Sequence, residues 1–197
     1  MQTLPLSKAV VTYTPNFLSD SAAYYTEFLQ FPWVMREAVY DGDVTYKLKR
    51  ATCAFGDPGV YAPAIWGKDL TVLPWPERLR EIKDKVEAYV GTRYNICLCN
   101  YYETGRNNIG WHSDREEALS PANIASISLG AARSFGFQHI NNADERYVMV
   151  LEPGSLLVMG NGCQEEYRHA LLPDKDLKEG RINLTFRLFD DQRYGKY

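Results

Sequence analysis

Apolar residues recur at helical spacing in two stretches of the first half of the chain. Residues 19–30 begin with Ser19, a residue type that commonly caps helices, and bring four apolar side chains near one face. A second stretch runs from Pro76, which suits a first turn, to Gly91, which is typical of a C-terminal stop. Its apolar positions are Leu79, Ile82, Val86 and Val90. The pattern therefore predicts two helices, which we expect to brace a sheet.

After Gly91 the apolar residues form shorter runs, separated by turn pairs such as Asn141-Asn142 and Pro153-Gly154. The predicted strands span residues 94–102, 109–113, 124–129, 134–139, 147–151, 155–159, 166–170 and 182–189. Two strand-like pieces, 44–48 and 51–55, precede a loop at 56–74 whose length suggests a functional role. Many short strands with tight turns favour an antiparallel sandwich or jelly roll over alternating strand and helix units.

Composition narrows the class of protein without choosing a function. A chain of 197 residues with 45% apolar and 24% charged residues is expected to form one globular domain. The net charge of -3 gives no support to a general nucleic-acid binder, so such a partner would need a local cluster of cations. No apolar run approaches the roughly 18 residues of a membrane span, so we expect no membrane partner. The four cysteines lack CxxC spacing, which indicates reduced thiols and an intracellular location, in the cytoplasm or nucleus. We also expect a monomer.

The three histidines, His112, His139 and His169, limit the possible metal sites. His112 and Asp114 lie two apart, and a strand places such residues on one face. A third ligand from a distant strand, either His169 or His139, would complete the two-histidine, one-carboxylate triad of non-haem Fe(II) oxygenases. The HxD pair alone is also typical of a surface turn with a solvated acid, so other residues must support the metal site.

The last predicted strand alternates polar and apolar side chains, which gives it one polar face and one apolar face. An ordinary half-exposed antiparallel strand has the same pattern. The polar face carries Arg181, Asn183 and Arg187, and such a set can bind a dicarboxylate because guanidinium groups pair with carboxylates in bidentate geometry. Asn100 and Tyr102, also two apart on a predicted strand, offer neutral hydrogen bonds to the same ligand.

Taken in order along the chain, these motifs resemble the AlkB family of 2-oxoglutarate- and Fe(II)-dependent dioxygenases, which repair alkylated nucleic acids. The matching residues are Asn100-x-Tyr102, His112-x-Asp114, His169 and Arg181-x-Asn183-x-Thr185-Phe186-Arg187, with similar stretches at 121–129 (PANIASISL) and 154–159 (GSLLVM). The resemblance covers roughly residues 45–190. It implies a mainly β fold, a double-stranded β-helix or jelly roll with iron inside its mouth, N-terminal helices bracing the sheet and a substrate lid.

The resemblance also implies a role for each motif. His112, Asp114 and His169 would be the catalytic Fe(II) ligands, with O2 as the other substrate at the metal. The residues implied to bind 2-oxoglutarate are Asn100, Tyr102, Arg181, Asn183, Thr185 and Arg187. Arg181 would pair with the carboxylate far from the metal, whereas Arg187 and Asn100 would lie near the chelating carboxylate. His139 matches no ligand position and is expected to be a strand-end residue.

The activity that the resemblance implies is oxidative dealkylation of N-alkylated bases. The bases are 1-methyladenine and 3-methylcytosine in DNA or RNA, and the products are succinate, CO2 and formaldehyde. A methylated base inside a duplex is out of reach, so the nucleotide must be flipped or already unpaired. Residues 1–75 are expected to form the N-terminal extension and nucleotide-recognition lid of a single domain spanning 1–197.

Candidate substrate contacts lie in this lid. Lys47, Lys49 and Arg50 form a local cationic cluster in the sequence, which could hold phosphates. Tyr61 or Trp66 offers an aromatic face on which a base could stack, although either ring could simply pack in the core.

Two departures from the family pattern favour single-stranded DNA or RNA over duplex DNA as the partner. Arg115 stands where duplex-repair relatives often have an acid, and residues 40–43 offer no apolar wedge. Glu116 could accept a hydrogen bond from the exocyclic amine of cytosine or adenine, or it could be a solvated loop acid. Two other functions stay open on this scaffold: a 2-oxoglutarate-dependent hydroxylase of a protein or small molecule, and a catalytically silent binding module.

Overall fold

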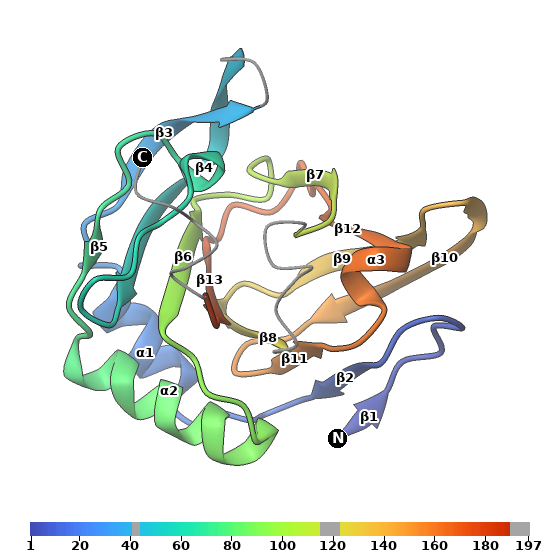
Figure 1. Cartoon of the computed structure of the whole chain (residues 1–197), viewed down its shortest axis with the longest axis horizontal. Helices are drawn as coiled ribbons and strands as arrows, with labels where there is room; N and C mark the ends of the chain where they lie inside the picture. The colour runs from blue at the N-terminus through green and yellow to red at the C-terminus, as the bar shows by residue number, and fades with distance from the viewer. Residues whose placement is uncertain (41–43, 115–122, 190–197) are drawn as a thin grey trace.

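Two antiparallel sheets face each other in the computed structural model, which describes residues 1–40, 44–114 and 123–189 (Figure 1). The larger sheet has the strand order β1-β2-β11-β8-β13-β6-β4-β3, with β5 pairing parallel to β4. Its strands are β1 (Gln2–Thr3), β2 (Val11–Thr14), β3 (Val34–Tyr40), β4 (Val44–Gly56), β5 (Val72–Leu73), β6 (Ile96–Tyr102), β8 (Ile124–Gly130), β11 (Leu156–Met159) and β13 (Arg181–Arg187). The smaller sheet has the order β10-β9-β12-β7. Its strands are β7 (Ile109–His112), β9 (Arg133–His139), β10 (Asn142–Leu151) and β12 (Tyr167–Leu171).

Two helices cover the outer face of the larger sheet (Figure 1). They are α1 (Ser21–Phe28) and α2 (Glu77–Val90), and Gly91 ends α2 at a φ of +74°, which a glycine adopts without strain. Phe28 of α1 and Ile82 of α2 lie in one buried cluster with the apolar residues of β13. The predicted jelly roll and its bracing helices are therefore confirmed. Short helical pieces occur at η1 (Ala64–Trp66) and α3 (Cys163–Glu166). Among the helices of the described ranges, none has the length and apolar character needed to cross a membrane.

The alternation of β13 separates two buried layers rather than a core from solvent. Ile182, Leu184 and Phe186 pack toward the helices and are fully buried. Arg181 and Asn183 point the other way, between the two sheets, and are only 2% and 8% exposed. The half-exposed strand that the pattern also allowed is therefore wrong, because both faces of β13 are covered.

The structure changes several predicted boundaries. Residues 44–48 and 51–55 belong to one 13-residue strand, β4, because Arg50 in its middle is buried and donates from Nε to the Asn100 Oδ1 at 2.6 Å. The strands β1, β2 and β3 were not predicted, and neither was β5, which lies within the predicted loop at 56–74. They are short or lie at the end of the sheet order, where the apolar pattern is weak.

Candidate metal and cosubstrate site

A cavity of about 360 Å³ lies between the two sheets. This volume falls at the small end of the range for small-molecule sites, roughly 300 to 1,000 Å³. The cavity wall combines inward-facing residues of β13 and β6 from the larger sheet with residues of β7 and β12 from the smaller one. Residues as far apart in the chain as Tyr46 and Arg187 therefore share one pocket.

Three potential metal ligands meet in this cavity. His112 on β7 and His169 on β12 are register partners, so their rings lie side by side with centroids 4.4 Å apart. Asp114 follows two residues after His112 and reaches both rings: its Oδ1 is 3.7 Å from His112 Nε2 and its Oδ2 is 3.5 Å from His169 Nε2. The ligand atoms of the three residues all lie within 4.8 Å of one another. One ion can therefore contact all three side chains.

The hydrogen bond of His112 fixes which ring nitrogen faces this centre. Its Nδ1 is 2.8 Å from the Gly110 carbonyl oxygen, and because a carbonyl only accepts, Nδ1 carries the proton. The lone pair of Nε2 is then available to a metal. Burial, and secondarily the neighbouring His169, lowers the pKa of His112 to about 4, so the neutral ring that can bind metal is the form present at neutral pH.

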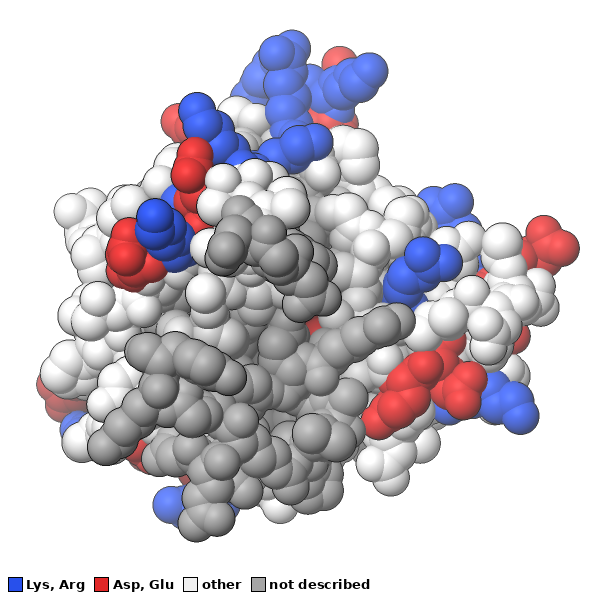
Figure 2. Space-filling model, turned by 45° about the horizontal axis from the view of Figure 1, so that its top comes forward, with Lys and Arg blue, Asp and Glu red and all other residues white. Residues whose placement is uncertain are grey.

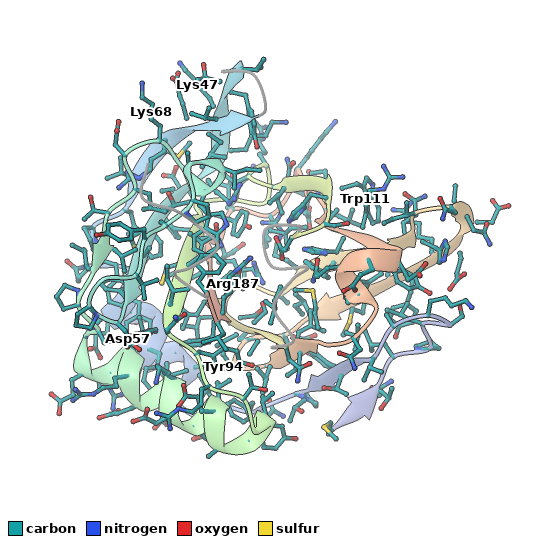
Figure 3. All side chains as sticks on the ribbon, in the orientation of Figure 1. Lys47, Asp57, Lys68, Tyr94, Trp111 and Arg187 are labelled. Carbon is teal, nitrogen blue, oxygen red and sulfur yellow. The ribbon has the colours of Figure 1, made fainter. Side chains whose placement is uncertain are left out.

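Asp114 is held from several sides. Burial alone would raise the pKa of its carboxyl, but Arg187, whose Nη2 lies 3.3 Å from Oδ2, and His169 together hold that pKa well below its usual range. Its backbone N–H donates to the Oε1 of buried Gln164 on α3 at 2.9 Å. Arg187 lies at the centre of the fold between the two sheets (Figure 3) and also stacks on the Trp66 ring, 4.8 Å from its centroid.

Arg181 is a buried cation without a carboxylate partner among the described residues. It is 2% exposed, its Nη2 donates to Ser128 Oγ at 2.8 Å, and its guanidinium lies 5.5 Å from the centre of the Tyr102 ring. Its Nε has no hydrogen-bond partner in the described structure. Burial lowers its pKa to about 10, so the group is still charged at neutral pH. A buried, uncompensated guanidinium is costly, and a ligand carboxylate in this cavity would compensate it.

The other predicted cosubstrate residues on this face form a hydrogen-bonded chain. Asn183 Oδ1 accepts from Thr185 Oγ1 at 2.8 Å and from Asn100 Nδ2 at 3.2 Å, and its Nδ2 donates to Ser126 Oγ at 2.8 Å. Asn100 in turn accepts from Arg50. The amides of Asn100 and Asn183 are thus engaged with the protein, which fixes the inner face of the larger sheet around Arg181.

Sequence reasoning missed four residues of this site. Arg133 is fully buried near Tyr102 and donates to backbone carbonyls, including those of Gly105 and Leu172. The other three are Ser126, Ser128 and Gln164. Each acts through a partner far along the chain, so no local pattern marks it. Arg133 alone carried a signal, since an arginine directly before a predicted apolar strand needs buried acceptors if the strand includes it.

The structure places the predicted cationic substrate contacts in different environments. Arg50 lines the cavity but is 7% exposed and bonded to Asn100. Lys47 and Lys49 also belong to the cavity wall, but both are exposed and alternate with Arg50 along β4. The role of these three cations in holding phosphates stays a prediction.

The aromatic candidates also differ. Trp66 lines the cavity but is 4% exposed, because it packs on Phe189 and under Arg187. Tyr61 is 64% exposed and lies outside the residues that line the cavity. Its role and that of Trp66 in stacking on a base stay predictions. Glu116 and Arg115 lie outside the described residues.

His139, the third histidine, ends β9 as expected and lies outside the metal-binding group. Its Nε2 is 3.5 Å from Glu166, and its ring meets Tyr167 edge to face.

Comparison with known proteins agrees with this geometry. The model of the 2OG-Fe(II) oxygenase superfamily matches residues 11–187. The chain therefore belongs to the 2OG-Fe(II) oxygenase superfamily. A solved structure described as "The structure of OsALKBH1" superposes with a TM-score of 0.66, at 22% identity, and covers 94% of this chain and 100% of that one, which supports the same fold.

Curated relatives confirm the AlkB resemblance within this superfamily. The human "Alpha-ketoglutarate-dependent dioxygenase alkB homolog 3" is 33% identical over 175 residues, covering 82% of this chain and 59% of that protein. The human "DNA oxidative demethylase ALKBH2" is 35% identical over 150 residues, covering 72% of this chain and 57% of that protein. The chain thus spans a little under three fifths of the length of these relatives.

The residues present fit the cofactors of the superfamily. Two imidazoles and one carboxylate are the donor set of a non-haem Fe(II) centre with open coordination positions. Arg181, buried and lacking a carboxylate among the described residues, fits the free carboxylate of 2-oxoglutarate. The coordination positions that these three protein ligands leave open would admit 2-oxoglutarate and O2.

Proposed function

We propose that this chain is an Fe(II)- and 2-oxoglutarate-dependent dioxygenase that oxidatively dealkylates N-alkylated bases, with single-stranded DNA or RNA carrying 1-methyladenine or 3-methylcytosine as substrate. One observation carries the proposal: a two-histidine, one-carboxylate group and a buried Arg181 without a carboxylate of its own share one cavity. The similarity to the DNA oxidative demethylase ALKBH2 supports a nucleic-acid substrate.

Each part of the chain has a defined task in this proposal. His112, Asp114 and His169 would hold the iron, which supplies the oxidising chemistry together with 2-oxoglutarate and O2. Arg181 would bind and orient the cosubstrate, and the Asn100–Asn183 chain keeps the surrounding sheet rigid. Binding in the cavity between the two sheets would shield the reacting methyl group from bulk water. The products would be succinate, CO2, formaldehyde and the repaired base.

The test is turnover of methylated oligonucleotides, with base products measured by mass spectrometry and succinate measured in parallel. Single-stranded oligonucleotides with 1-methyladenine or 3-methylcytosine should lose the methyl group only with iron and 2-oxoglutarate present. The variants His112→Ala and His169→Ala should be inactive, whereas His139→Ala, the matched histidine outside the site, should keep its activity.

Other outcomes would favour the alternatives. Succinate formed only with peptides or small molecules would replace the proposal with a hydroxylase of those substrates. A protein that takes up iron and 2-oxoglutarate but oxidises none of these substrates would point to a binding module. Duplex substrates turned over faster than single strands would overturn the strand preference.

A further inference from the structure

An aromatic ring and a guanidinium are stacked on the outer face of the smaller sheet. His112 points into the cavity, so the preceding Trp111 points to the opposite face of β7. The Trp111 ring lies over Gly136 of β9, where an added Cβ would come within 2.7 Å of its Cη2. Arg146 of β10 places its guanidinium 5.0 Å from the centre of the Trp111 ring. Figure 3 shows Trp111 at the smaller sheet, away from Arg187 at the centre.

A second arginine belongs to the same face. Arg146 is the register partner of Gln138, which is also the register partner of Arg168 on β12. The three residues form a row across three strands, so the two arginine backbones lie about 10 Å apart. Both arginines are exposed, and neither has an ion-pair partner among the described residues. Val148, 45% exposed, continues this face along β10.

This surface adjoins the cavity. Trp111 and Gly110 belong to the cavity wall, so β7 carries a metal ligand on one side and the stacked ring on the other. The whole chain has a net charge of -3, but the two arginines, which lack ion-pair partners among the described residues, make the surface beside the pocket locally positive. On the face shown in Figure 2, Lys and Arg side chains gather at the top, and basic and acidic side chains lie side by side at the left and right.

We infer that the surface formed by Trp111, Arg146 and Arg168 binds the single-stranded polynucleotide on one side of the nucleotide whose base enters the cavity. The inference rests on the proposed function. A planar guanidinium held flat on an indole offers a face on which an unpaired neighbouring base stacks, and the second arginine pairs with a phosphate. Bases within a duplex are already stacked on each other, so this surface selects single strands.

The first experiment measures binding without turnover. Fluorescence anisotropy follows a labelled, unmodified single strand of about 15 nucleotides, a length near the upper site size of single-strand binders. The double variant Arg146→Ala/Arg168→Ala should bind at least about 5-fold more weakly, with a salt slope lower by roughly 0.7 for each lost phosphate contact. Arg80→Ala, which removes an exposed arginine from α2 on the far side of the larger sheet, should bind as the unmodified protein does. Equal binding by the double variant overturns the inference, as does an equal loss in Arg80→Ala.

The second experiment separates this inference from the proposed function. KM should rise in the double variant for a methylated strand of about 15 nucleotides but not for a methylated trinucleotide, with kcat and metal content unchanged. Turnover by the unmodified protein with identical KM values in the double variant would sink the inference and leave the proposed function standing. Weaker strand binding by the double variant, combined with no turnover of methylated bases by the unmodified protein, would support the surface but overturn the proposed function. Lower metal content in the double variant would show that the stack braces β7 instead, which also overturns the inference.

Discussion

At the residue scale, the site depends on polar groups buried without local partners. Arg181 keeps its charge inside the fold, where its guanidinium donates a hydrogen bond to Ser128 and lies over the face of the Tyr102 ring. Such a cation weakens the free protein and strengthens the ligand complex, because a carboxylate supplies the missing charge. The cost in stability and the affinity for a dicarboxylate therefore have the same origin.

Replacement of Arg181 by methionine should separate these two effects. The charge-assisted pair with 2-oxoglutarate is worth roughly 1.5 to 3 kcal/mol, so the KM for 2-oxoglutarate should rise about 10- to 150-fold. The free protein should melt at an unchanged or higher temperature, since a buried guanidinium gives way to an apolar side chain of similar length. Thermal melts with and without 2-oxoglutarate, beside cosubstrate kinetics, measure both. Normal cosubstrate affinity combined with a lower melting temperature would show that Arg181 is only a structural residue.

Gln164 illustrates how a residue outside the ligand set positions a ligand. Its Oε1 accepts the Asp114 backbone N–H, and in Gln164→Met that buried donor loses its partner. We expect a loss of about 1 to 3 kcal/mol in the free energy of unfolding, together with weaker Fe(II) binding. Urea unfolding and metal titration measure the two effects. Glu165→Gln, an exposed neighbour on α3, is the matched control and should change neither. Metal affinity at the wild-type level in Gln164→Met would remove Gln164 from the site.

At the scale of the element, the alternation of polar and apolar residues along strands made part of the site predictable. Residues whose burial depends on partners far along the chain could not be predicted. The polar face of β13 and the spacing of His112 and Asp114 are local patterns, and the structure places both in the cavity. Arg50 instead interrupted a predicted strand, because its burial depends on Asn100, 50 positions away. Burial that depends on a distant partner leaves no mark in the local sequence.

Gly136 offers a test of how β7 is seated on the smaller sheet. A side chain at this position would collide with the Trp111 ring, so Gly136→Ala must displace β7 or the ring. We expect a loss of about 1 to 3 kcal/mol in the free energy of unfolding, which is typical of overpacking. Metal binding should also weaken, because the metal ligand His112 directly follows the displaced Trp111. Gly110→Ala is the control, since nothing lies within 4 Å of its added Cβ. Chemical unfolding and metal titration of both variants decide, and equal behaviour of the two would show that Trp111 moves aside freely.

At the scale of the whole molecule, the fold class followed from many short strands with turns, whereas the arrangement around the cavity required the tertiary structure. The two histidines come from neighbouring strands of the smaller sheet, and Arg187 reaches Asp114 from the larger one. The metal site thus lies where the two sheets meet. Protons and metal compete there for the same nitrogen and oxygen atoms, so acid should act on both the metal site and the stability of the fold.

The direction of this acid effect follows from the pKa of His112, which burial and His169 lower from 6.5 to about 4. The unfolded chain takes up this proton near pH 6.5, but the folded chain does so only near pH 4. Between these values the unfolded state binds more protons, so the stability contributed by neutral His112 is present above about pH 6.5 and is lost as the pH falls toward 4. The lowered pKa of Asp114 acts in the same direction at still lower pH.

We therefore expect the free energy of unfolding of the chelator-treated protein to decrease as the pH falls through this window, as measured by urea unfolding at a series of pH values. His112→Asn removes the titrating ring, so its unfolding free energy should vary less with pH over the same range. With Mn(II) as a redox-inert substitute for Fe(II), the dependence should become steeper, because each proton taken up at the ligands displaces metal that stabilises the folded state. A metal-free protein whose stability varies as little with pH as that of His112→Asn would mean that His112 is solvated rather than held in a dry site. The cavity between the sheets would then be too open to protect the chemistry proposed for it.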